Sequence, residues 1–159
     1  MKCQESENRI CLDANVLVSY YCDDENRPET KILMDVLDTQ KYFIVCPALL
    51  NFEITNSFSR KERLKIISQE YASEAIRHIF QLPIILVWQN EYLQESLDIQ
   101  RQALPSIFDA AYVATARKNK IPLITEDHAL IKKGRKVYPA IYTTQEWLGL
   151  STFGKPLSI

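Results

Sequence analysis

The chain has 159 residues, of which 47% are hydrophobic and 25% are charged, and its formal net charge is −1. This length is enough for one domain with a substantial core, and the composition is that of an ordinary soluble globular protein. The near-zero net charge gives the surface as a whole no attraction for nucleic acid, so such binding would need a local basic patch, and no apolar run approaches the roughly 20 residues that span a bilayer.

In the first half of the chain, predicted strands alternate with predicted helices. Residues 9–13 and 42–47 are short apolar runs typical of buried strands, and residues 29–39 carry apolar side chains on one helical face. Residues 48–58 also have near-helical apolar spacing. The charged stretch 60–80 predicts one or two amphipathic helices.

The second half continues this alternation. Its predicted elements are a strand at 83–88, helices at 91–104 and 107–119, strands at 121–125 and 137–142, and a closing helix at 144–150. Ser106 is predicted to cap its helix, with Asp109 at the third position of a capping box, and Thr144 is predicted to cap the closing helix.

Strands alternating with helices predict the α/β class, as a three-layer α/β/α fold around a central, mainly parallel sheet. We expect a single domain over residues 8–150, followed by a C-terminal tail at 151–159. The chain has only three glycines and therefore no glycine-rich phosphate loop, which argues against a Rossmann or Walker nucleotide site.

The N-terminus and the cysteines indicate the compartment. The polar segment MKCQESENRI lacks the apolar stretch of a signal peptide, so we expect an intracellular, cytoplasmic protein. The cysteines form no CxxC pair and have no histidine cluster near them, which argues against a zinc site. We interpret them as small buried hydrophobic residues in a reducing compartment: Cys3, Cys11, Cys22 and Cys46.

Four acidic residues are expected at one edge of the sheet. Asp13 ends the first predicted strand and Asp127 comes at the end of the fourth, after Thr125; Glu53 lies early in the helix after the second strand, and Asp109 begins its own helix. Ligands of open parallel sheets bind outside the carboxyl ends of the strands. Carboxylates gathered there repel one another unless a cation holds them, and hard Mg²⁺ or Mn²⁺ ions prefer such oxygen ligands and can hydrolyse phosphodiesters.

Each of these acids also has an ordinary structural interpretation. Asp109 could simply cap its helix, which contributes about 0.5–1 kcal/mol. Asp13 and Asp127 could be turn residues, and Glu53 a solvated helix residue. The neighbouring Glu126 could take the place of Asp127. Their joint placement at one sheet edge favours the metal site.

The segments around these acids resemble the motifs of PIN-domain ribonucleases, of the kind found in VapC-type toxins. LDANVLVSYY is similar to the first motif, ALLNFEITNSF to the second, and SIFDAAYVATARKNKIPLITED to the third and fourth. VYPAIYTTQEWLGL resembles the last strand and closing helix of the family. The resemblance extends over about residues 9–150, nearly the whole chain.

The resemblance implies a role for each residue. Asp13 and Asp109 would be the principal Mg²⁺ or Mn²⁺ ligands, Glu53 would bind metal or position the attacking water, and Asp127 would complete the site, partly through water. Asn15 and Thr125 would orient these ligands.

The resemblance also implies a function and partners. The chain would be a Mg²⁺-dependent endoribonuclease acting on RNA, a homodimer, and the toxin of a toxin–antitoxin pair with a small antitoxin protein. Alternatives on the same fold are an RNA-processing or DNA-directed nuclease without antitoxin, or a binding module without turnover.

Basic residues supply candidates for RNA contact. They are Arg60, Lys61, Lys132, Lys133 and Arg135. The cluster around Lys132 could equally be a solvated loop. Trp88 and Trp147 are expected in the core rather than stacked on bases, and the absence of a Ser–His–Asp or Cys–His arrangement gives no support to covalent catalysis.

Overall fold

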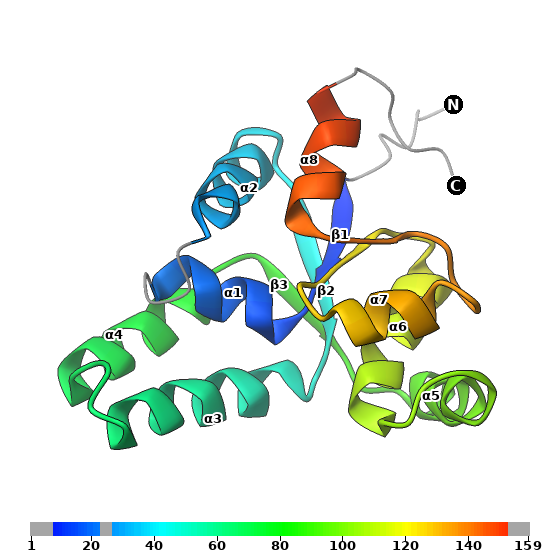
Figure 1. Ribbon diagram of the computed structural model, residues 1–159, viewed down its shortest axis with the longest axis horizontal. Coiled ribbons are helices and arrows are strands. Elements are labelled where there is room, and N and C mark those ends of the chain that lie inside the picture. Colours follow the sequence, from blue (N-terminus) through cyan, green and yellow to red (C-terminus); the bar gives the residue numbers. More distant parts are fainter. Residues whose placement is uncertain (1–7, 23–26, 153–159) are drawn as a thin grey trace.

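The computed structural model describes residues 8–22 and 27–152, and it has a five-stranded parallel sheet covered by helices on both faces (Figure 1). The strand order is β3-β2-β1-β4-β5, so β1 lies in the centre. The strands are β1 (Arg9–Leu12), β2 (Phe43–Pro47), β3 (Ile84–Val87), β4 (Leu123–Ile124) and β5 (Ile141–Tyr142). This confirms the predicted three-layer α/β/α fold.

Eight helices complete the described part of the chain. They are α1 (Ala14–Tyr21), α2 (Pro28–Thr39), α3 (Leu50–Arg63), α4 (Gln69–Ile79), α5 (Asn90–Gln102), α6 (Ile107–Asn119), α7 (His128–Gly134) and α8 (Thr144–Thr152). Helices α1 to α4 lie on one side of the sheet, and α5, α6 and α7 on the other (Figure 1). None of these helices is both long enough and apolar enough to cross a membrane.

The core explains why β1 has an uninterrupted apolar sequence. Helices cover both faces of this central strand, so Ile10, Cys11 and Leu12 are all fully buried. Cys46 in the neighbouring strand and Cys22 after α1 are buried as well, as expected. Cys3 lies outside the described residues.

The last two strands are shorter than predicted. Residues 121–125 and 137–142 each contribute only two residues to the ladder, in which Leu123 pairs with Ile141 and Ile124 with Tyr142. Pro122 and Pro139 precede these pairs and lack the N–H that a ladder requires. The strands at the β5 side of the sheet are therefore shorter than those at the β3 side.

Two helices are absent from the predicted elements. Helix α1 is rich in β-branched and aromatic residues, which favour strands, but Asp13 caps its start and five of its residues are buried. Helix α7 covers a stretch interpreted as a possible loop, and Asp127 caps it. In both cases an aspartate of the candidate site starts the helix.

The predicted cap of the closing helix was wrong by one residue. Helix α8 already includes Thr144, and Thr143 forms the capping box: its hydroxyl accepts from the Glu146 N–H at 3.1 Å, and the Glu146 carboxylate accepts from the Thr143 N–H at 2.9 Å. The Thr144 side chain is instead buried. The helix also continues to Thr152, so it includes the start of the predicted tail, of which residues 153–159 lie outside the described residues.

Candidate active site

Asp13 lies at the centre of the candidate site because it follows the central strand. Its backbone N–H donates to the Ile124 carbonyl at 2.9 Å, which fixes it beside the end of β4. Its carboxylate oxygen Oδ2 accepts from the Thr125 hydroxyl at 2.6 Å and from Asn15 Nδ2 at 3.0 Å. Asn15 and Thr125 therefore restrict how the Asp13 carboxylate can turn.

The same network extends to the turn after β4. Thr125 is fully buried, and its hydroxyl oxygen also accepts from the Asp127 N–H at 3.0 Å. Asn15 Oδ1 accepts from the Glu126 N–H at 3.3 Å. The ends of β1 and β4 are thus joined through side chains as well as through the sheet.

Asp127 and Glu126 have different surroundings although they are neighbours. Asp127 Oδ1 caps α7 by accepting from the N–H groups of Ala129 at 2.7 Å and Leu130 at 3.0 Å. The Glu126 carboxylate pairs with Arg27 at 2.7 Å and accepts from the Thr144 N–H at 2.9 Å. Glu126 thus joins the starts of α2 and α8.

Glu53 enters the site from α3 and Asp109 from α6. Glu53 lies in the first turn of α3, half-buried, and its Oε2 accepts a hydrogen bond of 2.5 Å from the Tyr112 hydroxyl. Asp109 lies in the first turn of α6, which Ser106 caps as predicted, by accepting from the Asp109 N–H at 3.3 Å. Tyr112 is not among the site residues predicted from the sequence; its spacing of three residues from Asp109 in the same helix is the one signal that indicates it.

Burial and mutual repulsion disturb the titration of these carboxyl groups. Burial, with further contributions from the charges of Asp109 and Asp127, raises the pKa of Asp13 to about 6, although the hydrogen bond from Thr125 opposes this. Burial, and then the charges of Asp13 and Asp109, raise the pKa of Glu53 to about 7. The carboxyl groups are therefore close enough for the charge of one to raise the pKa of another.

The basic end of α7 acts on Asp109. Burial and the negative charge of Asp127 raise the pKa of Asp109, and the positive charge of Lys133 partly offsets them. Lys132 and Lys133 are exposed in the last turn of α7. One candidate cation for RNA contact therefore lies near the acidic site.

The donor set fits a hard divalent cation in its chemistry. No group of three His, Cys, Asp or Glu side chains within residues 8–22 and 27–152 is arranged to hold one metal ion. Mg²⁺, however, usually takes one or two carboxylates and keeps several waters. Asp13 together with Glu53 or Asp109 offers such a set, and a cation would relieve the repulsion that adds to burial in raising the pKa values of Asp13 and Glu53.

An open groove of about 490 Å³ leads away from the carboxylates of Asp13 and Glu53. The lining begins with Asp13, Asn15 and Glu53, continues along α3 with Asn56 and Ser57, and reaches Arg60, Lys61, Leu64 and Ile66. Polar side chains thus connect the acidic site with the basic last turn of α3. Arg60 and Lys61, two of the candidates for RNA contact, line this groove.

Arg135 is placed differently from the other candidates. Its guanidinium donates to the Ile141 carbonyl at 2.7 Å and pairs with Glu146 at 2.5 Å, and it lies 5.9 Å from the centre of the Tyr142 ring. These contacts tie the end of α7 to β5 and α8. Its position indicates a structural role.

The expectation that both tryptophans lie in the core was wrong for Trp88. Trp147 is buried, but Trp88 is 72% exposed just after β3, and Phe52, beside Glu53, is 81% exposed. The Ala48 N–H donates to the Val87 carbonyl at 3.0 Å, which ties together the chain segments that carry these two aromatic residues. The carboxyl edge of the sheet therefore exposes aromatic as well as acidic side chains.

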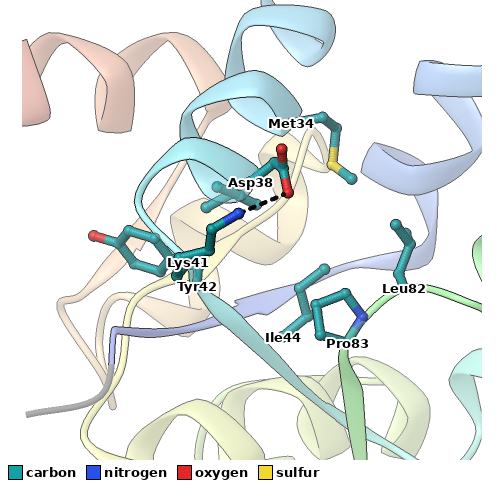
Figure 2. A pocket seen from close by; sticks show the side chains of 8 residues that line it. Met34, Asp38, Lys41, Tyr42, Ile44, Leu82 and Pro83 are labelled. Carbon is teal, nitrogen blue, oxygen red and sulfur yellow. Dashed lines mark ion pairs between the residues drawn. The ribbon is translucent and has the colours of Figure 1, made fainter.

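A second, smaller cavity lies at the opposite edge of the sheet (Figure 2). It has a volume of about 100 Å³ and is mostly apolar, with Met34, Ile44 and Leu82 among its lining residues. Asp38, its one acidic side chain, pairs with Lys41 at 3.6 Å on the exposed rim. Tyr42 and Pro83 directly precede β2 and β3, so this cavity belongs to the amino ends of the strands, away from the carboxylates.

The chain matches a known protein family in sequence and several solved structures in fold. The family model described as the PIN domain matches residues 10–136. No curated protein matches the sequence. Several solved structures share the fold.

Three of these structures show how far the likeness extends. PAE2754 from Pyrobaculum aerophilum has a TM-score of 0.68 at 17% identity, over 92% of this chain and 96% of its own. A toxin–antitoxin complex from Klebsiella pneumoniae has a TM-score of 0.59 at 17% identity, and the match covers 85% of this chain and 97% of that one. VapBC2 from Rickettsia felis, solved with a DNA fragment from its promoter, has a TM-score of 0.59 at 13% identity. That match covers 85% of this chain and 96% of the other. At these identities the likeness is one of fold.

Proposed function

The chain belongs to the PIN-domain family, whose members are nucleases, and from that premise we propose that it is a metal-dependent endoribonuclease. It would hydrolyse phosphodiester bonds of single-stranded or structured RNA in the cytoplasm. One observation carries the proposal: Asp13 and Glu53, whose pKa values are raised by burial and by the negative charge of Asp109, line a groove that Arg60 and Lys61 also line.

The carboxylates would divide the work of holding the metal. Asp13 and Asp109 would be the principal ligands, with Asp13 oriented by Thr125 and Asn15. Glu53 would bind the ion or accept a proton from the attacking water. A bound Mg²⁺ or Mn²⁺ supplies the positive charge that makes water a nucleophile at neutral pH and stabilises the leaving oxygen.

Asp127 would contribute from farther out. One of its oxygens already caps α7 through two N–H groups, so it has less freedom to bind an ion directly. A contact through water suits this geometry, and it agrees with the ability of Mg²⁺ to retain several waters.

The groove accounts for how an acidic site could hold an anionic substrate. Arg60 and Lys61 would bind phosphates on one side of the carboxylates, and Lys132 and Lys133 on the other. An open groove suits a single strand, because its backbone can enter while its bases turn outward.

We further propose that the protein is the toxin of a toxin–antitoxin pair and forms a homodimer. A toxin–antitoxin complex from Klebsiella pneumoniae and VapBC2 from Rickettsia felis share its fold. Exposed Phe52 and Trp88 on joined segments, with Phe108 59% exposed beside Asp109, support burial of this edge against another chain.

The direct test is cleavage of labelled single-stranded RNA with Mg²⁺, with Mn²⁺ and with EDTA. Wild-type protein and Asp38→Asn, which alters an exposed acid at the opposite edge, should cut only with metal. Asp109→Asn should lose roughly 100-fold or more of the activity, while circular dichroism shows it folded. Cleavage that persists in EDTA or in Asp109→Asn would contradict the proposal, as would a folded wild-type protein that cuts no RNA.

A further inference from the structure

We infer that Tyr112 is a positioning residue, which holds the Glu53 carboxylate in the orientation that receives a divalent cation. The inference rests on the metal site of the proposed function. It adds a residue from the middle of α6 whose hydroxyl reaches the site from the protein interior.

The geometry starts from α6, which packs against the central strands. Tyr112 is 2% exposed, so its ring belongs to the core, yet its hydroxyl donates to Glu53 Oε2 at 2.5 Å. Residues three apart in a helix share a face. Asp109 and Tyr112 therefore point toward the site together, so one helix supplies both a carboxylate and the donor that fixes another carboxylate.

Thr125 provides a parallel on the other side of the site. Its buried hydroxyl donates to Asp13 Oδ2 at 2.6 Å, much as the Tyr112 hydroxyl donates to Glu53 Oε2. In each pair a buried hydroxyl engages one carboxylate oxygen and restricts the rotation of the group. A ligand held in this way loses less freedom when an ion binds, and donors of this kind typically change metal affinity 10- to 100-fold.

The competing interpretation is that Tyr112 is a core residue whose hydroxyl needed a partner. Tyr138 shows how this protein meets that need elsewhere: it is also buried, and its hydroxyl donates to the Ile121 backbone carbonyl at 2.8 Å. Tyr112 donates instead to a half-buried carboxylate that comes from a different helix and borders the groove. Tyr138→Phe is therefore a matched control, because it removes a buried tyrosine hydroxyl away from the carboxylates.

The test is calorimetric titration of the full chain with Mn²⁺ in the absence of RNA. We expect Tyr112→Phe, which keeps the ring, to bind Mn²⁺ 10- to 100-fold more weakly than the wild type, and Tyr138→Phe to bind as the wild type does. In a double-mutant cycle, Tyr112→Phe should have no further effect once Glu53→Gln is present, because it acts through Glu53.

The outcomes separate this inference from the nuclease proposal. Equal Mn²⁺ affinity in Tyr112→Phe and wild type would overturn the inference, as would equal losses in Tyr112→Phe and Tyr138→Phe or a wild type that binds no Mn²⁺. If the cycle behaves as expected but the wild type cuts no RNA, the positioning role stands and the nuclease proposal falls. If RNA is cut but Tyr112→Phe leaves the Mn²⁺ affinity unchanged, the nuclease proposal stands and the positioning role of Tyr112 falls.

Discussion

Asp13 and Glu53 bind protons more tightly in the folded chain than carboxyl groups ordinarily do. Their pKa values rise from 3.8 to about 6 and from 4.5 to about 7, with burial as the largest cause. Between about pH 4 and pH 7 the folded state therefore holds more protons at these positions than the unfolded state. The free energy of unfolding contributed by these groups must then fall as the pH rises through this window.

This dependence can be measured by denaturant unfolding in EDTA from pH 4 to pH 8. The double variant Asp13→Asn, Glu53→Gln cannot ionise at these positions, so its stability relative to the wild type should increase across the window. Saturating Mn²⁺ should restore stability to the wild type at pH 8 and do little at pH 4, where protons occupy the carboxylates. A constant difference between the two proteins from pH 4 to pH 8 would contradict the assignment.

At the scale of single residues, the sequence identified acids but could not give their surroundings. Asp13, Glu53, Asp109 and Asp127 could be singled out because the ends of parallel strands converge. The donor on Glu53 comes from the interior of an apolar helix, where a tyrosine is ordinarily a core residue. Such a contact depends on how α3 and α6 approach each other, which periodicity does not encode.

At the scale of secondary structure, the start of α8 offers two adjacent threonines with opposite roles. Thr143 caps the helix, so Thr143→Ala should lower the free energy of unfolding by about 1 kcal/mol. The Thr144 hydroxyl is buried with no hydrogen-bond partner in the described part of the chain, so Thr144→Val, of similar shape, should raise it by about 1 kcal/mol. Denaturant unfolding of both variants measures these two changes. If Thr144→Val lowered the free energy of unfolding and Thr143→Ala did not, Thr144 would be the cap after all.

The elements differ in how well their sequences predicted them. Residues 107–119 matched α6, because a serine cap and a long apolar face agree with each other. Helix α1 was missed because local preference favours a strand there, and only the Asp13 cap and burial of its valines against the core override that preference. The short ladder of β4 and β5 depends on prolines whose effect becomes clear only once the strands are paired.

At the scale of the whole molecule, the exposed aromatic residues at the carboxyl edge bear on assembly. If this edge is a dimer interface, the double variant Phe52→Lys, Trp88→Lys should be a monomer where the wild type is a dimer, because it would bury charges without partners. Multi-angle light scattering measures this directly. Ile32→Lys, at an exposed apolar position of α2, should remain a dimer, and a monomeric wild type would refute the dimer.

The bridge made by Glu126 extends the support of the site to the end of the chain. Its carboxylate pairs with Arg27 and accepts from the Thr144 N–H, the first of α8. Its own N–H donates to the side chain of Asn15, which in turn donates to the Asp13 carboxylate. A protease cut or a stop codon just before residue 143 would remove no residue of the groove. It would nevertheless remove the hydrogen bond from the Thr144 N–H to Glu126 and so loosen the turn after β4, which supports Asp13. Loss of the closing helix would therefore disturb the carboxylates although it contributes none of them.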